Sequence, residues 1–516
     1  MTDTRPIPNS YWVLPGKFLA GEYPRDLDGG SSESKIAAFL RAGVTSFVNL
    51  TSPGDGLEPY ADIVDHLADT DLTLHRFPIR DVSVPSSPSQ MAEILDTIDS
   101  EIQRGGTVYL HCWGGVGRTG ITVGCWLVRH GYSGPSALER VQELWSGCPK
   151  SEWLRSPETA EQRDYIINWR EHGDGDAGLR MGPDLERRLH SRFHGTIFGL
   201  AIGDALGAPV EFMRRDEIVE HYGPNGIDDL DEWGGFPTGY YTDDTQMSLA
   251  TAHGLITWKH DSQNQRPSEP TASVYRSYLK WREIQHDPNQ RRAPGHTCLS
   301  ALDSGEMGSI EHHINNSNGC GGVMRTAPVG LVLEFSDPFR TGAECAAITH
   351  GHPSGYLSAG YLSELIVRLV RGCELKSAAR ATRHSLVSYE GHEETLEFVD
   401  RALELADSNT TAHDAIEQLG QGWVGEEALA IALFVALRYP DDWKAATLAA
   451  VDHSGDSDSS GSICGAILGA TLGIEAIPPR WIEQIENRVL LDKTASDMYA
   501  VFVENKTLSM REYPPN

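Results

Sequence analysis

The chain has 516 residues, more than one ordinary hydrophobic core accommodates, which predicts two or three domains. Apolar residues make up 40% of the sequence and charged residues 22%, proportions typical of a soluble globular protein. The formal net charge of −30 would repel a polyanion, so we expect no general nucleic-acid binding. A small anionic ligand in a local pocket stays compatible with this charge.

The eight cysteines are scattered and form no CxxC pair, which favours a reducing compartment over a disulfide framework or a zinc ribbon. The N-terminal stretch MTDTRPIPNS lacks the apolar centre of a signal peptide. No apolar run approaches the roughly 18 residues that a membrane span needs. The sequence therefore predicts a cytoplasmic protein that does not bind membranes.

The first part of the chain alternates between strand-like and helix-like segments. Residues 44–50 and 107–112 are rich in β-branched and aromatic side chains and predict strands. Residues 34–43 and 91–103 carry apolar side chains at helical spacing. Such alternation predicts an α/β domain over residues 1–170, with a central sheet flanked by helices.

A linker is predicted at 171–186, where Gly, Asp and Pro interrupt the pattern. The periodic segments after it are nearly all helical, and we expect an all-α bundle over residues 187–495 and a C-terminal tail over 496–516. Examples of these segments are 242–258, 358–372 and 426–439.

The stretch VYLHCWGGVGRTG, residues 108–120, predicts a strand that ends at His111, a loop, and a helix that starts near Arg118. Backbone N–H groups of a glycine-rich turn at a helix N-terminus form an anion site. Cys112 would face these dipoles and a guanidinium, which together favour the thiolate. Arg118 offers a planar fork for two phosphoryl oxygens. The stretch therefore predicts phosphoryl transfer through a phosphocysteine.

A buried structural cysteine is the alternative interpretation, but the spacing His-Cys-x5-Arg-Thr-Gly in a strand–loop–helix context is specific. It resembles the signature of the protein tyrosine and dual-specificity phosphatase superfamily, over roughly residues 8–170. The resemblance implies that Thr119 assists the thiolate as leaving group and that no cofactor is needed. SPETAEQ, 156–162, resembles the family segment that positions the hydrolytic water, with Gln162 as the candidate. The loop residues expected to bind phosphate are Trp113, Gly114, Gly115, Val116 and Gly117.

The departing oxygen needs a proton, so a general acid is expected on a loop upstream of the signature. FPIRDVSVPSS, 77–87, offers Asp81 and resembles the family's acid loop, although Ile79-Arg80 stands where the family commonly has Trp-Pro. A solvated turn aspartate is the alternative interpretation. The carboxylates that would then replace it are Glu58, Asp62 and Asp71.

Two clusters of acidic and hydroxyl residues in the second part of the chain each lead into a helix-like segment. Hard oxygen ligands of this kind suit Mg²⁺, Mn²⁺ or Ca²⁺ and not zinc, and a pair of metals about 3.5–4 Å apart would activate a water. Helix capping is the alternative role. An EF-hand is excluded, because its twelfth position, counted from Asp456, is Ile467 instead of glutamate. The candidate ligands are Thr242, Asp243, Asp244, Asp456, Asp458 and Ser459.

Five motifs occur in a fixed order and together resemble the ADP-ribosylglycohydrolase family over roughly residues 190–475. They are GLAIGDALGAPVEF (199–212), YTDDTQMS (241–248), NSNGCGGVMRTAPVGL (316–331), ITHGHPSGYLSA (348–359) and SGDSDSSGSICGAILG (454–469). The resemblance implies an all-α orthogonal bundle with two Mg²⁺ or Mn²⁺ ions. It also implies hydrolysis of the glycosidic bond of an ADP-ribosylated protein or small molecule.

The resemblance places the two oxygen clusters as the metal ligands. Glu211 matches an acid that approaches the ribose in some branches of the family, with a surface glutamate as the alternative. Asp204 is expected to make interhelical hydrogen bonds, and Arg325 to pack behind the glycine-rich loop. His350 with His352 also raises a transition-metal site, which lacks a third ligand. The expected ADP-ribose contacts are Ser317, Asn318, Gly319, Cys320, Gly321 and His350.

The sequence as a whole predicts a bifunctional hydrolase. One domain would remove phosphate from a phosphorylated protein or small molecule, and the other would release ADP-ribose. The alternative hypothesis is a metal-dependent ADP-ribose-binding module that delivers substrate to an active phosphatase.

Overall fold

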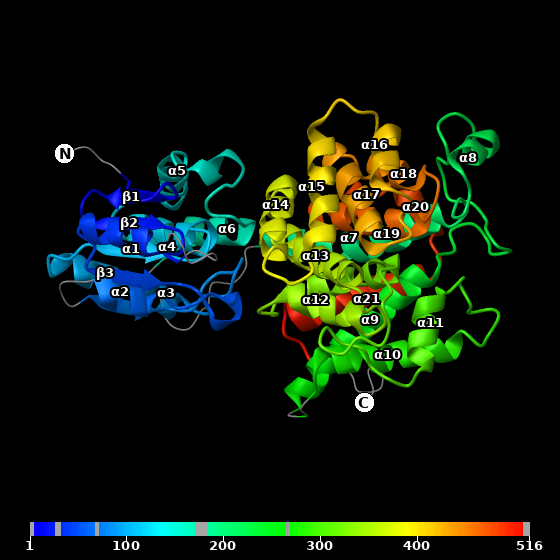
Figure 1. Ribbon diagram of the computed structural model, residues 1–516, viewed down its shortest axis with the longest axis horizontal. Helices are drawn as coiled ribbons and strands as arrows, with labels where there is room; N and C mark the ends of the chain where they lie inside the picture. The colour runs from blue at the N-terminus through cyan, green and yellow to red at the C-terminus, as the bar shows by residue number, and fades with distance from the viewer. Residues whose placement is uncertain are drawn as a thin grey trace. The chain divides into compact units, whose positions relative to one another are not determined.

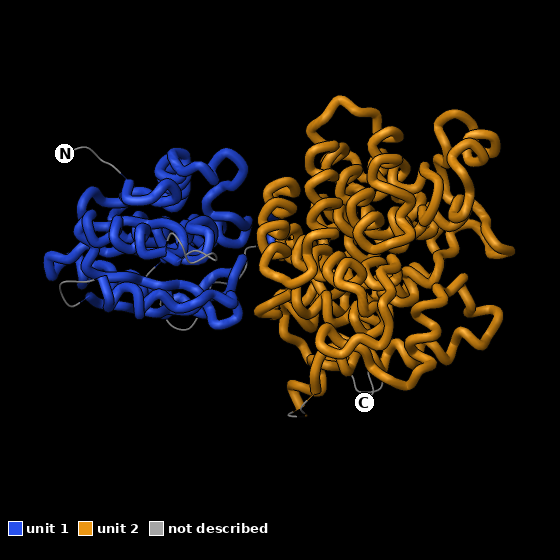
Figure 2. Tube along the Cα trace, in the orientation of Figure 1, with its two compact units in different colours: residues 1–185, 371–373 blue, residues 186–370, 374–516 orange. Residues whose placement is uncertain are grey.

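The computed structural model describes residues 5–25, 32–67, 72–170, 183–264, 266 and 268–508. The chain forms two compact units (Figure 2). The first comprises residues 1–185 and 371–373, and the second comprises 186–370 and 374–516.

The first unit is built on a five-stranded sheet with the order β1-β2-β5-β3-β4. Figure 1 labels β1, β2 and β3 of this sheet. β1 and β2 are antiparallel, and the other neighbouring pairs are parallel. β5 therefore lies between β2 and β3, and His111 at its end pairs with Gly21 and Asn49. The strands are β1 (Ser10–Leu14), β2 (Phe18–Gly21), β3 (Ser46–Asn49), β4 (Thr73–Arg76) and β5 (Val108–His111).

Helices cover both faces of this sheet, because alternate strand residues point to opposite sides. Leu19, Phe47 and Tyr109 pack with residues of α1 (Ser32–Arg41) and α2 (Ala61–Leu67). The other face packs against α3 (Pro88–Gln103), α4 (Gly117–Arg129), α5 (Gly134–Trp145) and α6 (Ala160–Asn168). The predicted α/β architecture is confirmed, and the short turns η1 (Pro53–Asp55) and η2 (Pro149–Glu152) complete the unit.

The second unit is helical, as predicted, and its only β pairings within the described residues are two isolated bridges, Trp233 with Phe236 and Gly319 with Val424. Its elements are α7 (Pro183–Gly207), α8 (Arg215–Tyr222), α9 (Asp243–Gln263), α10 (Pro270–Ile284), α11 (His296–Asp303), η3 (Cys320–Arg325), η4 (Ala327–Leu331), α12 (Pro338–Ala347), α13 (Pro353–Val370), α14 (Leu375–Leu386), α15 (Glu393–Asp407), α16 (Ala412–Leu419), α17 (Gly425–Arg438), α18 (Trp443–Val451), α19 (Ser457–Leu472), η5 (Ile474–Ala476), α20 (Pro479–Gln484) and α21 (Arg488–Phe502).

A ladder of glycines joins α7 to α19. On α7, glycines recur every fourth residue at 195, 199 and 203, and each faces the backbone of a glycine on α19. A Cβ atom at Gly199 would overlap with the carbonyl of Gly465, and a Cβ at Gly465 would overlap with the carbonyl of Gly199. The two helices therefore approach more closely than any side chain at these positions allows.

Two predicted boundaries differ from the structure. Residues 171–182 of the predicted linker lie outside the described residues, and its last part already belongs to α7, which begins at Pro183. The tail predicted from residue 496 is wrong up to Phe502, because α21 continues to that residue with Met498 and Val501 buried. Among the described helices, none is both long and apolar enough to cross a membrane.

We predict that Gly465→Ala destabilises the second unit by about 3 kcal/mol, because the added methyl group must push α7 away from α19. Guanidinium unfolding of the full chain measures the change. The control is Gly295→Ala, whose Cβ meets no atom within 4 Å and should cost less than about 1 kcal/mol. Equal stability of the two variants would contradict the close-packing argument.

Candidate functional sites

The phosphate-loop sequence forms the predicted strand, loop and helix. β5 ends at His111, and α4 begins at Gly117, so the loop spans residues 112–116. Cys112 at its start is 3% exposed. Gly115 has a φ of 76°, and a Cβ there would lie 2.6 Å from the carbonyl carbon of Gly21. Only glycine fits this close approach, which holds the loop against β2.

The backbone of the loop is oriented by bonds on its outer side. The Trp113 carbonyl accepts from the Tyr23 N–H at 2.8 Å, and the Val116 carbonyl accepts from Ser156 Oγ at 2.8 Å. The N–H groups of Gly114 and Gly115 donate to no acceptor among the described residues. The loop thus keeps free donors at the start of a helix, the arrangement that binds an anion.

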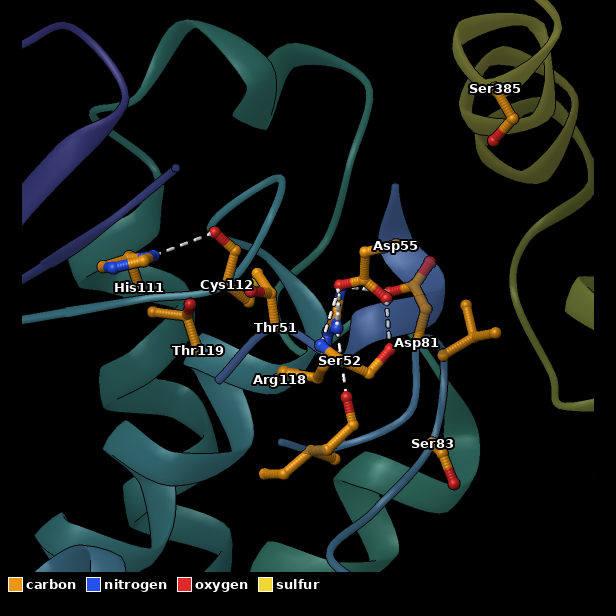
Figure 3. A network of polar contacts seen from close by, with 12 residues as sticks. Thr51, Ser52, Asp55, Asp81, Ser83, His111, Cys112, Arg118, Thr119 and Ser385 are labelled. Atoms are coloured by element: carbon orange, nitrogen blue, oxygen red, sulfur yellow. Dashed lines mark hydrogen bonds and ion pairs between the residues drawn. The ribbon is translucent and has the colours of Figure 1, made fainter. Parts of the chain in front are cut away.

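Arg118 is 1% exposed and is bound by two carboxylates (Figure 3). Its Nη1 donates to Asp55 Oδ2 at 2.5 Å and to the Ile79 carbonyl at 3.0 Å. Its Nη2 lies 2.9 Å from Asp81 Oδ1. Burial opposes the charge of Arg118, but Asp81 and Asp55 hold the pKa of this guanidinium above its usual value.

Asp55 is a site residue that sequence reasoning missed. It ends the η1 turn directly after β3, is buried, and accepts from Ser52 Oγ at 2.6 Å. Burial raises the pKa of Asp55, while Arg118 opposes this shift. The feature that could identify Asp55 from sequence is the order of the strands, because the loops after adjacent parallel strands meet at one edge of the sheet. The segments of β3 and β5 were both recognised in the sequence but were not paired.

Asp81 lies on the loop between β4 and α3, with its side chain 30% exposed and beside Arg118. Its neighbour Val82 has a φ of 47°, a strained conformation for a β-branched residue. The alternative acids do not share this position. Glu58 and Asp62 are exposed and pair with Arg25, and Asp71 lies outside the described residues.

Thr119 and Gln162 have other partners in this structure. Thr119 Oγ1 donates to the Gly21 carbonyl at 3.4 Å. The Gln162 side chain accepts from the Thr159 N–H at 3.2 Å and donates to the Ser83 carbonyl at 2.8 Å. Because Ser83 follows Asp81 by two residues, Gln162 anchors the loop that carries Asp81.

In the second unit, the predicted oxygen clusters form the N-termini of α9 and α19. The capping interpretation is correct for two residues of these clusters. Thr242 Oγ1 accepts from the Asp244 N–H, and Asp456 Oδ1 accepts from the Ser459 N–H. The clusters also meet across the fold, where Ser459 Oγ donates to Asp244 Oδ2 at 2.9 Å. The two clusters therefore cap their helices and also lie together in the fold.

Four carboxylates are buried at this junction, and none is more than 6% exposed. Burial raises the pKa of each one, and the charge of Asp458 raises the pKa of the other three further. Ionised carboxylates packed in this way repel one another and favour a cation. The four are Asp243, Asp244, Asp456 and Asp458.

Asp204 on α7 accepts hydrogen bonds from the start of α9, as expected for an interhelical hydrogen-bonding residue. Its carboxylate accepts from the N–H groups of Thr242 and Thr245, both at 2.9 Å, and from Thr245 Oγ1 at 2.6 Å. Burial and the charge of Asp458 raise the pKa of Asp204 to about 7. Asp204 thereby fixes the start of α9 against α7.

Glu211 lies within electrostatic range of the carboxylate cluster. It is half-buried just beyond the end of α7. Burial, followed by the charges of Asp458 and Asp456, raises the pKa of Glu211 to about 11.

The glycine-rich loop lies beside the same cluster. Cys320 Sγ donates to Asp456 Oδ2 at 2.8 Å, and Asn318 Nδ2 donates to Glu426 Oε1 at 3.3 Å. A Cβ at Gly321 would lie 3.0 Å from His350 Cε1, so the loop backbone runs close to this imidazole. Burial lowers the pKa of His350 to about 3, and the ring is neutral near neutral pH.

Other loop contacts complete this picture. Ser317 Oγ accepts from the Gly319 N–H at 3.3 Å. Arg325 packs behind the loop as expected, where it donates to Thr349 Oγ1 at 2.7 Å and stacks on Tyr278.

A divalent cation fits the chemistry of the buried donors, which are carboxylate and hydroxyl oxygens. Within the described residues, no three His, Cys, Asp or Glu side chains already surround one point closely enough to hold a metal ion. Cation binding at the cluster would thus require these side chains to turn. His352 Nδ1 lies 2.9 Å from Ser354 Oγ.

Comparison with known proteins assigns each unit to a family. The model of the family described as ADP-ribosylglycohydrolase matches residues 185–507. The chain belongs to the ADP-ribosylglycohydrolase family. A second model, described as "Swiss Army Knife protein, DSP-PTPase phosphatase domain", matches residues 8–163. The chain is therefore an enzyme in which a dual-specificity phosphatase domain precedes the glycohydrolase domain, and both sequence resemblances are confirmed.

Three relatives resemble the glycohydrolase domain along most of their own length. ADP-ribosyl-[dinitrogen reductase] glycohydrolase of Rhodospirillum rubrum is 26% identical over 310 residues, 58% of this chain and 92% of the relative. ADP-ribosylhydrolase ARH3 of Bos taurus is 25% identical over 367 residues, 62% of this chain and 95% of the relative. ADP-ribosylarginine hydrolase Tri1 of Pseudomonas putida is 24% identical over 367 residues, 67% of this chain and 90% of the relative.

A pH dependence follows from His111, whose Nδ1 lies 3.3 Å from the Cys112 carbonyl and whose Nε2 lies 2.7 Å from Tyr60 Oη. Burial lowers the pKa of His111 to about 3. The unfolded chain takes up a proton near pH 6.5 and the folded chain does not, so stability falls as the pH decreases from about 6.5.

We therefore predict that His111→Gln reduces the acid sensitivity of the phosphatase domain. Between pH of about 6.5 and about 5, the wild type should lose about 2 kcal/mol relative to the variant. Guanidinium unfolding at several pH values measures this difference. Parallel curves for the two proteins would contradict the neutral, buried imidazole.

Proposed function

We propose that the protein is a bifunctional hydrolase. The second unit releases ADP-ribose from an ADP-ribosylated protein or small molecule with the help of bound divalent cations, and the first hydrolyses phosphate monoesters through a phosphocysteine. The observation that carries the first activity is the convergence of buried carboxylates from α9 and α19 beside the glycine-rich loop. The second rests on Cys112 at the base of a loop with free N–H donors and a buried Arg118.

The cation ligands in this proposal are the hydroxyl and carboxylate oxygens of the two clusters. Mg²⁺ or Mn²⁺ bound there would supply Lewis acidity for the ribose hydroxyls and for an attacking water. Charge balance supports the proposal, because the burial of four carboxylates is otherwise unfavourable. The residues are Thr242, Asp243, Asp244, Asp456, Asp458 and Ser459.

The surrounding groups of the second unit then bind the sugar and the diphosphate. The backbone N–H of Gly321, and that of Gly319 once it leaves Ser317 Oγ, supply neutral donors for the diphosphate, and the glycines leave room for it. Neutral His350 offers a hydrogen bond to a ribose hydroxyl. Glu211, which would ionise once cations balance the charge of the neighbouring carboxylates, stabilises the positive charge that develops on the anomeric carbon as the glycosidic bond breaks.

In the phosphatase domain, the Cys112 thiolate attacks phosphorus while the bond to the leaving oxygen breaks, and protonated Asp81 gives that oxygen its proton. Arg118 and the loop N–H groups stabilise the charge on the transferring phosphoryl group. Asp81 then accepts a proton from the water that attacks the phosphocysteine, which frees the thiolate. Thr119 can assist this departure only after its hydroxyl leaves the Gly21 carbonyl.

ADP-ribosyl-arginine is the substrate to test first, because one relative is named as an ADP-ribosylarginine hydrolase. ADP-ribosyl-serine follows if arginine fails. Tight, metal-dependent binding of ADP-ribose without any release would favour the alternative hypothesis, a binding module that delivers substrate to the phosphatase.

We predict that the full chain releases ADP-ribose from an ADP-ribosyl-arginine peptide in Mg²⁺ or Mn²⁺, and that Asp243→Ala and Asp456→Ala reduce the rate at least about a hundredfold. The cation should also raise the unfolding temperature of the wild type but not of these variants. Asp441→Ala, an exposed aspartate, is the control. Undiminished release in both variants would overturn the assignment of the cluster.

We predict vanadate-sensitive phosphate release from an aryl phosphate, with a loss of at least about a thousandfold in Cys112→Ser. Cys148→Ser serves as the control, because Cys148 is equally buried and its Sγ donates only to the Ser10 carbonyl at 3.7 Å. A chelator should abolish ADP-ribose release and leave phosphate release intact. Phosphate release that persists in Cys112→Ser would exclude the phosphocysteine.

A further inference from the structure

The side-chain amide of Gln162 is enclosed between three parts of the phosphatase domain. Its Oε1 accepts from the Thr159 N–H at 3.2 Å, which ties the amide to the start of α6. Its Nε2 donates to the Ser83 carbonyl at 2.8 Å, in the loop that carries Asp81. A Cβ at Gly117 would lie 2.9 Å from both Oε1 and Nε2, so the amide also covers the first residue of α4. Gln162 therefore joins the acid-bearing loop to the end of the phosphate loop.

This enclosure removes the Gln162 amide from solvent, and the side chain is 0% exposed. In the phosphatases that the domain resembles, the corresponding segment positions the water that hydrolyses the phosphocysteine. A side chain orients such a water only from within hydrogen-bond distance, about 2.6–3.2 Å. The contacts of Gln162 are instead with Thr159 and with the acid loop (residues 77–87). They indicate that its role is to hold this loop.

Asp81 lies midway between two anchored carbonyl groups of the acid loop. Two residues before it, the Ile79 carbonyl accepts from Arg118 Nη1 at 3.0 Å. Two residues after it, the Ser83 carbonyl accepts from Gln162. Figure 3 shows Asp81 and Ser83 on the same loop beside Arg118. The backbone around Asp81 is thus fixed on both sides by side chains that belong to the phosphate site or cover it.

Val82, directly after Asp81, shows that the loop needs such restraint. Its φ of 47° is unfavourable for a β-branched residue, and a conformation of this kind persists only where surrounding contacts hold it. Its carbonyl accepts from Arg371 Nη1 at 3.0 Å, and the same nitrogen donates to Glu161 Oε2 at 2.7 Å. Residue 371 belongs to the first unit. The start of α6 therefore holds the loop directly through Gln162 and indirectly through Glu161.

The place of the Asp81 carboxyl group matters most when the leaving oxygen departs. Its Oδ1 lies 2.9 Å from Arg118 Nη2, beside the expected position of the phosphoryl group. A shift of about 1 Å in a reacting group can cost about a hundredfold in rate. A strongly basic leaving oxygen needs the proton of Asp81, whereas a weakly basic one departs without it. An error in the position of Asp81 therefore affects poor leaving groups far more than good ones.

This inference rests on the proposed phosphatase function. We propose that Gln162 is a positioning residue for Asp81 and acts on the formation of the phosphocysteine, not on its hydrolysis. By holding the Ser83 carbonyl, Gln162 keeps the Asp81 carboxyl group at the leaving oxygen. As the bond from sulfur to phosphorus forms and the bond from phosphorus to oxygen breaks, the proton of Asp81 passes to that oxygen. The Gln162 amide itself touches neither the substrate nor the attacking water.

The test is single-turnover kinetics of the full chain with two aryl phosphates. The release of the phenol measures formation of the phosphocysteine, and the release of phosphate measures its hydrolysis. Phenyl phosphate has a strongly basic leaving oxygen, and 4-nitrophenyl phosphate has a weakly basic one. Gln162→Ala should slow formation about tenfold or more with phenyl phosphate and less than about threefold with 4-nitrophenyl phosphate. Rapid denaturation should trap no more phosphocysteine in this variant than in the wild type.

A variant without the acid tests whether Gln162 acts through Asp81. Asp81→Asn removes the proton, so it should show the same dependence on the leaving group, with a loss of about a hundredfold for phenyl phosphate. Gln162→Ala added to Asp81→Asn should cause no further loss, because a residue that acts only through another has no effect once the other is gone.

Asn168→Ala is the matched control. Asn168 is an exposed amide on the same helix, and its Nδ2 donates to the Asp164 carbonyl at 2.9 Å. This variant should leave both rates unchanged with both substrates. Gln162→Met fills a similar volume without an amide and should reproduce the effect of Gln162→Ala. It decides the question if thermal melting shows that Gln162→Ala is unfolded.

Three results would overturn the proposal. Unchanged formation in a folded Gln162 variant, with phosphocysteine that accumulates from both substrates, would show that Gln162 positions the water. Equal slowing with both substrates, or a further loss in the double variant, would show that Gln162 acts on the phosphate loop and not through Asp81. A wild type that forms no phosphocysteine would instead refute the phosphatase function, and this inference with it.

Discussion

The contact on which the second unit depends is the backbone approach of α7 and α19. Glycines every fourth residue let the two helices touch without intervening side chains, and Gly207 at the end of α7 lies against the backbone of Asp458. Asp204, one turn earlier on α7, binds the start of α9. The glycine ladder thus sets the distance between the two helix N-termini that carry the acidic cluster. A looser pairing would separate Asp244 from Ser459, whose side chains now meet at 2.9 Å.

Of the two candidate sites of this enzyme, one has charges suited to an anion and the other has charges suited to a cation. The phosphatase domain buries one guanidinium and neutralises it with two carboxylates, so an anion must compete for it. The glycohydrolase domain buries four carboxylates whose mutual repulsion favours a cation. In both sites most of the charges lie in short turns or at helix termini, with Asp55 in η1, Arg118 at the start of α4 and the four carboxylates at the starts of α9 and α19. In the phosphate loop, this fixed placement lowers the reorganisation required when an anion binds.

The elements that could be predicted from the sequence are those with a local pattern of residue types. The glycines around Cys112 and Arg118 predicted the loop between β5 and α4. The regular apolar spacing of 242–258 and 426–439 predicted α9 and α17. Contacts between distant segments were not predictable in this way. Asp55 stands in an ordinary Ser-Pro-Gly-Asp turn, and only the order of the strands places it beside Arg118. The hydrogen bond from Cys320 to Asp456 likewise joins segments that no spacing rule relates.

The glycine ladder also bears on the order of events during synthesis. α7 opens the second unit and α19 lies close to its end, so the pair forms only after nearly the whole unit has left the ribosome. The phosphatase sheet, by contrast, is complete once residues up to α6 have emerged. Long-range contacts of the first kind slow folding, because the intervening chain must be ordered before they are made. In a nascent chain the phosphatase domain would thus be folded while the glycine face of α7 is still unpaired, because α19 has not yet been synthesised.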